Sequence, residues 1–90
     1  MSSTYPLTGY GLMAKRHWME FCPRMVKELE AQGKLEEALY EAQETTSAEM
    51  MELRNKLQKQ QNLTPQQAYD QAWEVIREKY IYLRPEETAV

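Results

Sequence analysis

The middle third of the chain, residues 34–61, carries an uninterrupted helical pattern that contains neither glycine nor proline. Its apolar or small residues recur every three or four positions and therefore fall on one side of an α-helix. They are Leu35, Leu39, Ala42, Thr46, Met50, Leu53 and Leu57. At about 1.5 Å per residue this helix would be about 40 Å long, more than the expected width of a 90-residue globule. We therefore expect other helices, or a second copy of the chain, to cover this stripe.

The weakest part of the pattern is Thr45-Thr46-Ser47, because hydroxyl side chains compete for backbone hydrogen bonds and lower helix propensity. A break there would give two helices of ordinary length. The continuous helix is the favoured interpretation, and the broken one remains an alternative.

A first helix is expected over residues 10–22, with Thr8 or Gly9 as its N-cap. Residues 1–8 are interpreted as a flexible tail. The predicted inward face carries one residue per turn, and further apolar residues widen it. The face consists of Tyr10, Met13, His17 and Phe21, with Leu12, Trp18 and Cys22 at its sides.

Pro23 cannot continue the first helix, yet it suits the first turn of a new one. We therefore predict a second short helix over residues 23–32, with Met25, Val26 and Leu29 inward. Gly33 is its expected C-cap, in the left-handed conformation. A single helix kinked at Pro23 is the alternative.

The last helix has the clearest start signal in the chain. Thr64 can cap, Pro65 occupies the first helical position, and Gln67 can complete a capping box. The helix is expected to run over residues 65–83, ahead of Pro85, with residues 85–90 as a flexible tail. Its predicted inward residues are Tyr69, Ala72, Trp73, Ile76, Tyr80 and Leu83.

Together these elements predict an all-α small helical bundle within one domain, residues 9–84. Two short N-terminal helices would pack across one long central helix, and the C-terminal helix would lie antiparallel to it. Val and Ile together number only five, which argues against a sheet. The predicted shared core is Leu35, Leu39, Leu53, Leu57, Trp73, Ile76 and Tyr80.

Residues able to carry catalysis are few. His17 is the sole histidine, and Cys22, five residues further on, points elsewhere on a helix, whereas a metal site needs three or four ligands. The glutamates of the central helix form a solvated stripe without a cleft for acid–base chemistry. We therefore expect no enzyme activity, no metal, no cofactor and no small-molecule ligand.

No secretory signal is visible in residues 1–11, which lack a basic start followed by an apolar run, and no apolar stretch reaches about 20 residues. We therefore expect a cytoplasmic protein that does not enter a membrane. Its one cysteine cannot form an internal disulfide, which agrees with a reducing compartment.

The formal net charge is −3, but residues 1–34 carry five Lys or Arg against three Glu. This mild excess does not make a nucleic-acid footprint. A cluster of basic residues near Trp18 nevertheless supports a second hypothesis, contact with nucleic acid through phosphate contacts and stacking. The candidate contacts are Lys15, Arg16, Arg24 and Lys27.

Three short motifs resemble the N-terminal half of TnpV, a family of small proteins encoded on bacterial transposons. They are Gly9-Tyr10-Gly11-Leu12-Met13, Trp18-Met19-Glu20-Phe21 followed by Pro23, and Gly33-Lys34-Leu35 with Leu39. The similarity covers roughly residues 7–45. The resemblance implies a helical protein associated with mobile elements, and it brings no established functional residue.

The favoured function is a non-enzymatic protein-interaction module that self-associates and is linked to a mobile element. Its expected interaction stripe is Leu35, Leu39, Met50, Leu53 and Leu57. A nucleic-acid-binding accessory protein that uses the basic first helix is the alternative.

Overall fold

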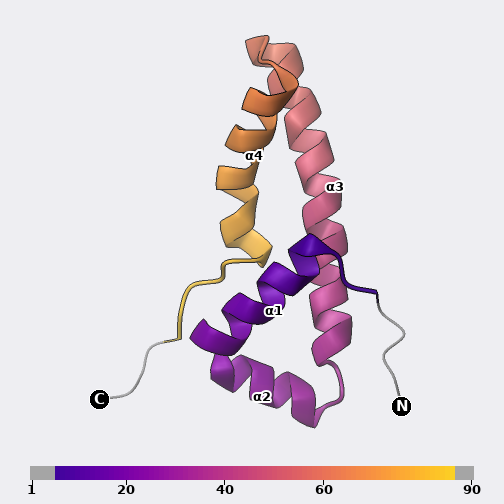
Figure 1. Ribbon diagram of the computed structural model, residues 1–90, viewed down its shortest axis with the longest axis vertical. Helices are drawn as coiled ribbons and strands as arrows, with labels where there is room; N and C mark the ends of the chain where they lie inside the picture. Colours follow the sequence, from indigo (N-terminus) through magenta and orange to yellow (C-terminus); the bar gives the residue numbers. More distant parts are fainter. Residues whose placement is uncertain (1–5, 87–90) are drawn as a thin grey trace.

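Four helices follow one another along the chain: α1 (Gly9–Phe21), α2 (Pro23–Ala31), α3 (Leu35–Gln61) and α4 (Pro65–Tyr80). They are seen in a computed structural model that describes residues 6–86 (Figure 1). No strand occurs within this range. The predicted all-α class is therefore confirmed.

The boundary between α1 and α2 forms at Pro23, which occupies the first turn of α2. The result is two helices, not one kinked helix. Gly33 follows α2 with a φ of +69°, the left-handed conformation predicted for it. The backbone N–H of Lys34 then donates to the carbonyl of Leu29 at 2.8 Å, which closes the end of the helix.

Helix α3 is continuous through Thr45-Thr46-Ser47, so the predicted long helix is confirmed over 27 residues. It ends at Asn62, which has a φ of +56°. Asparagine adopts this left-handed conformation more readily than most residues, and it reverses the chain here.

Helix α4 begins with the predicted capping box. The Thr64 hydroxyl accepts from the backbone N–H of Gln67 at 3.2 Å, and the Gln67 side chain accepts from the backbone N–H of Thr64 at 3.1 Å. The other end differs from the prediction. The helix stops at Tyr80, not Leu83, and the following residues form an extended segment that reaches α1 and α2.

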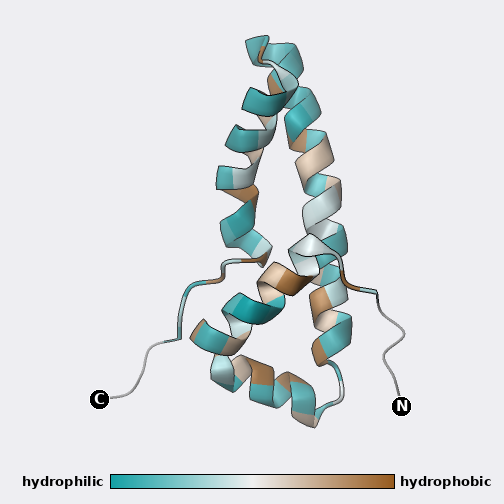
Figure 2. Cartoon of the chain, viewed as in Figure 1, coloured by the Kyte–Doolittle hydropathy of each residue, from teal (hydrophilic) through white to brown (hydrophobic). Residues whose placement is uncertain are grey.

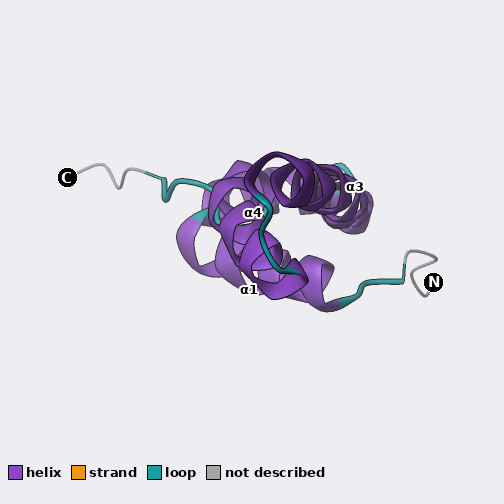
Figure 3. Ribbon diagram, turned by 90° about the horizontal axis from the view of Figure 1, so that it is seen from above, coloured by secondary structure: helices purple, strands orange, loops and turns teal. Residues whose placement is uncertain are grey.

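Helices α3 and α4 form an antiparallel hairpin, and α1 crosses α3 near the open end of this hairpin (Figure 1). Viewed along the hairpin, α1 lies to one side of the α3–α4 pair (Figure 3). The Cα trace measures 46 × 38 × 14 Å, so the molecule is flat. The predicted arrangement of two short helices across a long antiparallel pair is confirmed.

The core is divided into two clusters. The first joins α1, α2, the start of α3 and the segment after α4: Ala14, Trp18, Cys22, Val26, Leu35, Leu39, Ala42 and Ile81. The second joins α3 and α4: Met50, Ala72 and Ile76. Between them on α3 lie two buried polar residues, Gln43 and Thr46.

The single shared core of the sequence analysis is thus wrong in one respect. Leu35 and Leu39 belong to the first cluster, whereas Ile76 belongs to the second. The other predicted core residues are half-buried and pack against these clusters: Leu53, Leu57, Trp73 and Tyr80. Figure 2 shows mostly hydrophilic residues at the closed end of the α3–α4 hairpin, where neither cluster lies.

The inward face of α1 also differs from the prediction. The buried residues are Gly11, Ala14 and Trp18, followed by Cys22 after the helix. The side of α1 that was predicted to face inward points away from α3. His17 on that side is half-buried, and Phe21 is exposed. Gly11 and Ala14 are small and therefore allow α1 to approach α3 closely. The number and spacing of apolar residues in the sequence do not reveal this approach.

The segment before α1 is held in place. The backbone carbonyl of Pro6 accepts from Nε2 of Gln43 at 3.1 Å, and the backbone N–H of Thr8 donates to Oε1 of the same side chain. Leu7 packs against the first cluster. These contacts attach residues 6–8 of the predicted tail to α3 and the first cluster, and residues 1–5 lie outside the described range.

Within residues 6–86, no helix is both long enough and apolar enough to cross a membrane.

Candidate interaction surface

The stripe of the central helix is covered by the chain itself. Leu35 and Leu39 are buried in the first cluster and Met50 in the second, while Leu53 and Leu57 are half-buried against the second. Helices α1, α2 and α4 supply this cover. The stripe is therefore not an exposed surface, and the argument that it needs a second copy of the chain does not hold.

Large hydrophobic side chains remain exposed elsewhere, on α1. Leu12 is 56% exposed, Met19 is 48% exposed and Phe21 is 39% exposed. Leu12 and Met19 are seven residues apart, so they lie on the same side of the helix, whereas Phe21, nine residues after Leu12, lies on the opposite side. The sequence analysis placed Leu12 beside the inward face and missed this exposure.

A groove of about 390 Å³ runs along α1, and Leu12 and Phe21 both contribute to its lining. Its apolar walls come from α1 and from Tyr82, which follows α4. Arg16 and Glu20 add one cation and one anion, and within residues 6–86 neither forms an ion pair. The full lining is Gly9, Leu12, Met13, Arg16, His17, Glu20, Phe21 and Tyr82.

Aromatic rings fix the Tyr82 wall of the groove. The His17 ring centroid lies 4.6 Å from that of Phe21 and 5.1 Å from that of Tyr82. Trp73 of α4 lies 5.9 Å from Tyr82 and 5.5 Å from Tyr10 by the same measure. These separations are typical of favourable aromatic pairs. A continuous row of five rings therefore connects α1, Tyr82 and α4.

Residues 81–86, which we call the strap, lie across the corner between α1 and α2 (Figure 1). Backbone carbonyls of the strap accept from α1 side chains: Ile81 from Trp18 Nε1 at 3.1 Å, and Leu83 from His17 Nε2 at 2.8 Å. The Arg84 carbonyl lies 3.6 Å from the thiol of Cys22, which donates to it.

Glu86 completes the strap by capping α2. Its carboxylate accepts from the backbone N–H of Arg24 at 3.0 Å and from that of Met25 at 2.8 Å. Its own N–H donates to the carbonyl of Phe21 at 2.9 Å. A carboxylate is favourable at a helix N-terminus because the first N–H groups have no partner within the helix.

The sequence analysis missed the strap. It assigned residues 81–83 to the last helix and residues 85–90 to a flexible tail. In the predicted tail, Glu86 contacts the α1–α2 corner, and residues 87–90 lie outside the described range. The available signal was weak: Pro85 stops the helix, and three potential donors, His17, Trp18 and Cys22, lie close together in the sequence.

The four basic candidates for nucleic-acid contact are spread over α1 and α2. Arg16 lines the groove beside Glu20, and the backbone N–H of Arg24 is bound by the Glu86 carboxylate. Lys27 is exposed and Lys15 is half-buried. Acidic groups thus lie among the cations, and nucleic-acid contact stays a prediction.

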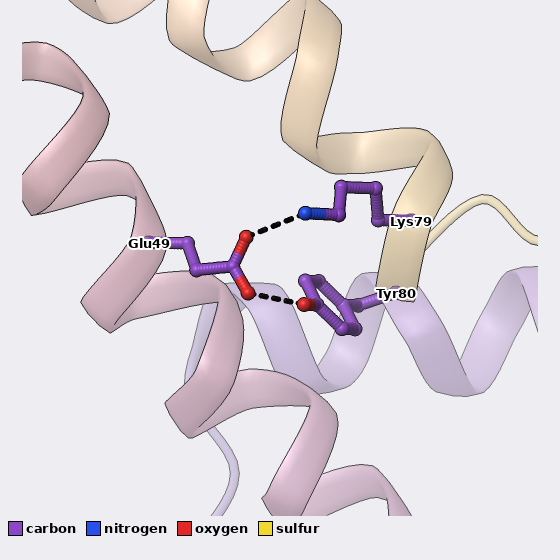
Figure 4. A network of polar contacts seen from close by, with 3 residues as sticks. All are labelled: Glu49, Lys79 and Tyr80. Carbon is purple, nitrogen blue, oxygen red and sulfur yellow. Dashed lines mark hydrogen bonds and ion pairs between the residues drawn. The ribbon is translucent and has the colours of Figure 1, made fainter.

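The two helices of the hairpin are joined by a polar network (Figure 4). The Glu49 carboxylate of α3 accepts from Lys79 Nζ at 2.8 Å and from the Tyr80 hydroxyl, both on α4. Hydrogen bonds from Lys79 and then Tyr80 lower the pKa of Glu49, and the bond to Glu49 raises the pKa of Lys79 and of Tyr80.

Two more titratable groups are perturbed by burial. Burial and the hydrogen bond with Tyr69 raise the pKa of Tyr10 to about 12; the two hydroxyls are 3.2 Å apart. Burial also raises the pKa of the Cys22 thiol, and the Glu86 charge adds to this. A raised thiol pKa makes Cys22 a poor nucleophile at neutral pH.

In the described part of the chain no three His, Cys, Asp or Glu side chains gather closely enough to hold a metal ion. His17 and Cys22 instead bind separate carbonyls of the strap.

Comparisons with protein-family models, with curated proteins and with solved structures find no match to this chain. The resemblance of residues 7–45 to TnpV therefore stays a prediction.

Proposed function

We propose that this protein is a non-enzymatic helical interaction module that self-associates. One observation carries the proposal: Leu12 and Met19 remain exposed on one side of α1, and Leu12 also lines a groove with apolar and aromatic side chains. Exposed apolar patches of this kind are typical of protein-binding surfaces.

A second copy of the chain is the proposed partner. Arg16 and Glu20 give the groove one charge of each sign, so two identical surfaces would not repel each other strongly. Methionine at positions 13 and 19 also suits such a contact, because its unbranched side chain adapts to varied shapes.

Sedimentation equilibrium over a range of concentrations tests the proposal. The wild-type chain should show a reversible monomer–dimer equilibrium, and Leu12→Glu should raise its dissociation constant by about tenfold or more, since it buries a charge in the contact. Val75→Glu is the matched control, because Val75 of α4 is 57% exposed, close to the 56% of Leu12.

A strict monomer at high micromolar concentration would refute self-association. Equal weakening by Leu12→Glu and Val75→Glu would show that the contact does not use the outward side of α1.

We also propose that the protein acts in the cytoplasm, which the single cysteine supports. The link to a mobile element is a proposal that rests on the TnpV resemblance, and a transposase gene beside the gene for this chain would support it.

A further inference from the structure

The groove along α1 has the size and the mixed lining of a small-molecule site. Its volume of about 390 Å³ lies within the range of about 300–1,000 Å³ that is typical of ligand pockets. Leu12 and Met13 line it with flexible apolar side chains, and Phe21 lines it with an aromatic one. Tyr82, from the strap, adds a second aromatic ring. In such sites the apolar lining holds the body of the ligand, and a few polar groups orient it.

Arg16 and Glu20 place opposite charges on the same face of α1. They are four residues apart and both line the groove, so their long side chains can reach a common point within it. Within residues 6–86 neither side chain forms an ion pair or a hydrogen bond. The guanidinium group is therefore available to a carboxylate, and the carboxylate of Glu20 is available to an ammonium group.

His17 adds an acceptor whose position is fixed by its neighbours. Its Nε2 lies 2.8 Å from the carbonyl oxygen of Leu83, and a carbonyl can only accept. Nε2 therefore carries the proton, and Nδ1 of the neutral ring is an acceptor. The rings of Phe21 and Tyr82 pack against this imidazole. The groove thus offers a cation, an anion and an acceptor next to aromatic rings.

We infer that the groove binds the zwitterion of an α-amino acid with an aromatic side chain. The ligand carboxylate pairs with Arg16, its ammonium group contacts Glu20 and Nδ1 of His17, and its ring packs among the apolar side chains. An anion alone would be repelled by Glu20 and a cation alone by Arg16, so a ligand that carries both charges is the best electrostatic match.

This inference goes beyond the proposed self-association and does not depend on it, because a single copy of the chain contains every residue of the groove. It departs from the expectation that no small molecule binds. Tyr82 reaches α1 only through the strap, which the sequence analysis missed.

An NMR titration of the isotope-labelled wild-type chain with L-phenylalanine tests the inference. Saturable shift changes should appear at the amides of Tyr82 and of the α1 residues that line the groove. The dissociation constant should be millimolar, as expected for a ligand of this size in an open groove. Glycine has both charges but no ring, and it should cause no saturable change there. If phenylalanine gives no saturable change, or if glycine binds equally well, the inference is overturned.

Sedimentation of the same samples measures self-association separately. A monomer that binds phenylalanine would refute self-association and leave the present inference intact. A dimer that does not bind phenylalanine would overturn the present inference alone.

Ligands that lack one charge identify the two ionic contacts. Phenethylamine lacks the carboxylate, so Arg16→Gln should weaken the binding of phenylalanine by about threefold and should not weaken that of phenethylamine. Phenylpropanoate lacks the ammonium group, so Glu20→Gln should weaken the binding of phenylalanine by about threefold and should not weaken that of phenylpropanoate. Lys27→Gln removes an exposed cation of α2 and is the matched control for Arg16→Gln. Equal weakening by these two variants would overturn the assigned carboxylate contact, and with it the inference.

Discussion

At the scale of single residues, Gln43 connects the start of the chain to the central helix. It is buried, and it binds the backbone of both Pro6 and Thr8. Gly11 lies directly against it: a Cβ atom at position 11 would be 2.5 Å from Gln43 Oε1 and 2.9 Å from a methyl carbon of Leu7. The absence of a side chain at position 11 therefore allows α1, α3 and residues 6–8 to meet.

We predict that Gly11→Ala destabilises the protein. The added methyl group would displace Gln43 from its bonds, and overpacking of this kind costs about 1–3 kcal/mol. The better helix propensity of alanine offsets about 1 kcal/mol of that cost. Chemical denaturation should therefore show a loss of about 1 kcal/mol in the free energy of unfolding.

Gly9→Ala is the matched control, because a Cβ atom at Gly9 would meet nothing within 4 Å. Its stability should equal or exceed that of the wild type. An equal loss in both variants would mean that close packing against Gln43 is not the reason for glycine at position 11.

At the scale of helices, local signals predicted most boundaries, and contacts distant in the sequence decided the exceptions. Pro23, Gly33 and the Thr64 capping box act within a few residues, so the sequence reveals them. The end of α4 depends on donors in α1, some 60 residues away, and Trp18 and His17 hold the strap out of the helical path.

The candidate surface was harder to predict than the helices. Both sides of α1 carry apolar residues, so the sequence alone does not tell which side faces α3. Two small residues, Gly11 and Ala14, settle this by allowing close approach. Leu12 is left on the outside as a consequence, and the groove beside it depends on Tyr82, whose position follows from the strap.

The link between α3 and α4 should depend on pH. The folded protein lowers the pKa of Glu49, so this stabilising contribution is present above pH 4.5 and is lost as the pH falls through and below that value. The folded protein raises the pKa of Lys79 and of Tyr80. Their stabilising contributions are therefore present at neutral pH and are lost as the pH rises above about 10. Thermal unfolding of Glu49→Gln and of the wild type should be measured over a range of pH. The difference between their thermal midpoints should be largest between these two limits, where the variant is the less stable.

The same charge change at Glu52, which is exposed on α3, is the control. Glu52→Gln should lower the thermal midpoint less at pH 7, and at pH 3 the two variants should be similar. If they were equivalent at pH 7, the network with Lys79 and Tyr80 would contribute nothing to the hairpin.

At the scale of the whole molecule, two clusters are connected mainly through α3, and the strap brings the last described residues to the first helices. The α1–α2 corner is complete only when Glu86 occupies the start of α2. The stability of the N-terminal half therefore depends on residues at the other end of the described chain.

We predict that Glu86→Ala lowers the free energy of unfolding by about 0.5–2 kcal/mol, the usual effect of losing a helix N-cap. Hydrogen exchange should accelerate first at the amides of Arg24 and Met25, which lose their acceptor. Glu78→Ala removes an exposed carboxylate of α4 and serves as the control. Unchanged exchange at both amides would contradict the capping role.

The distance along the chain between the corner and its strap also matters while the protein is being made. Trp18 and Ile81 are separated by 63 residues. A ribosome adds about 5–20 residues per second, so Trp18 emerges about 3–12 s before Ile81, the residue that binds its indole. During that interval the apolar corner is open to chaperones and proteases. Slower translation between the first helices and the strap would therefore lengthen the interval in which this corner is exposed.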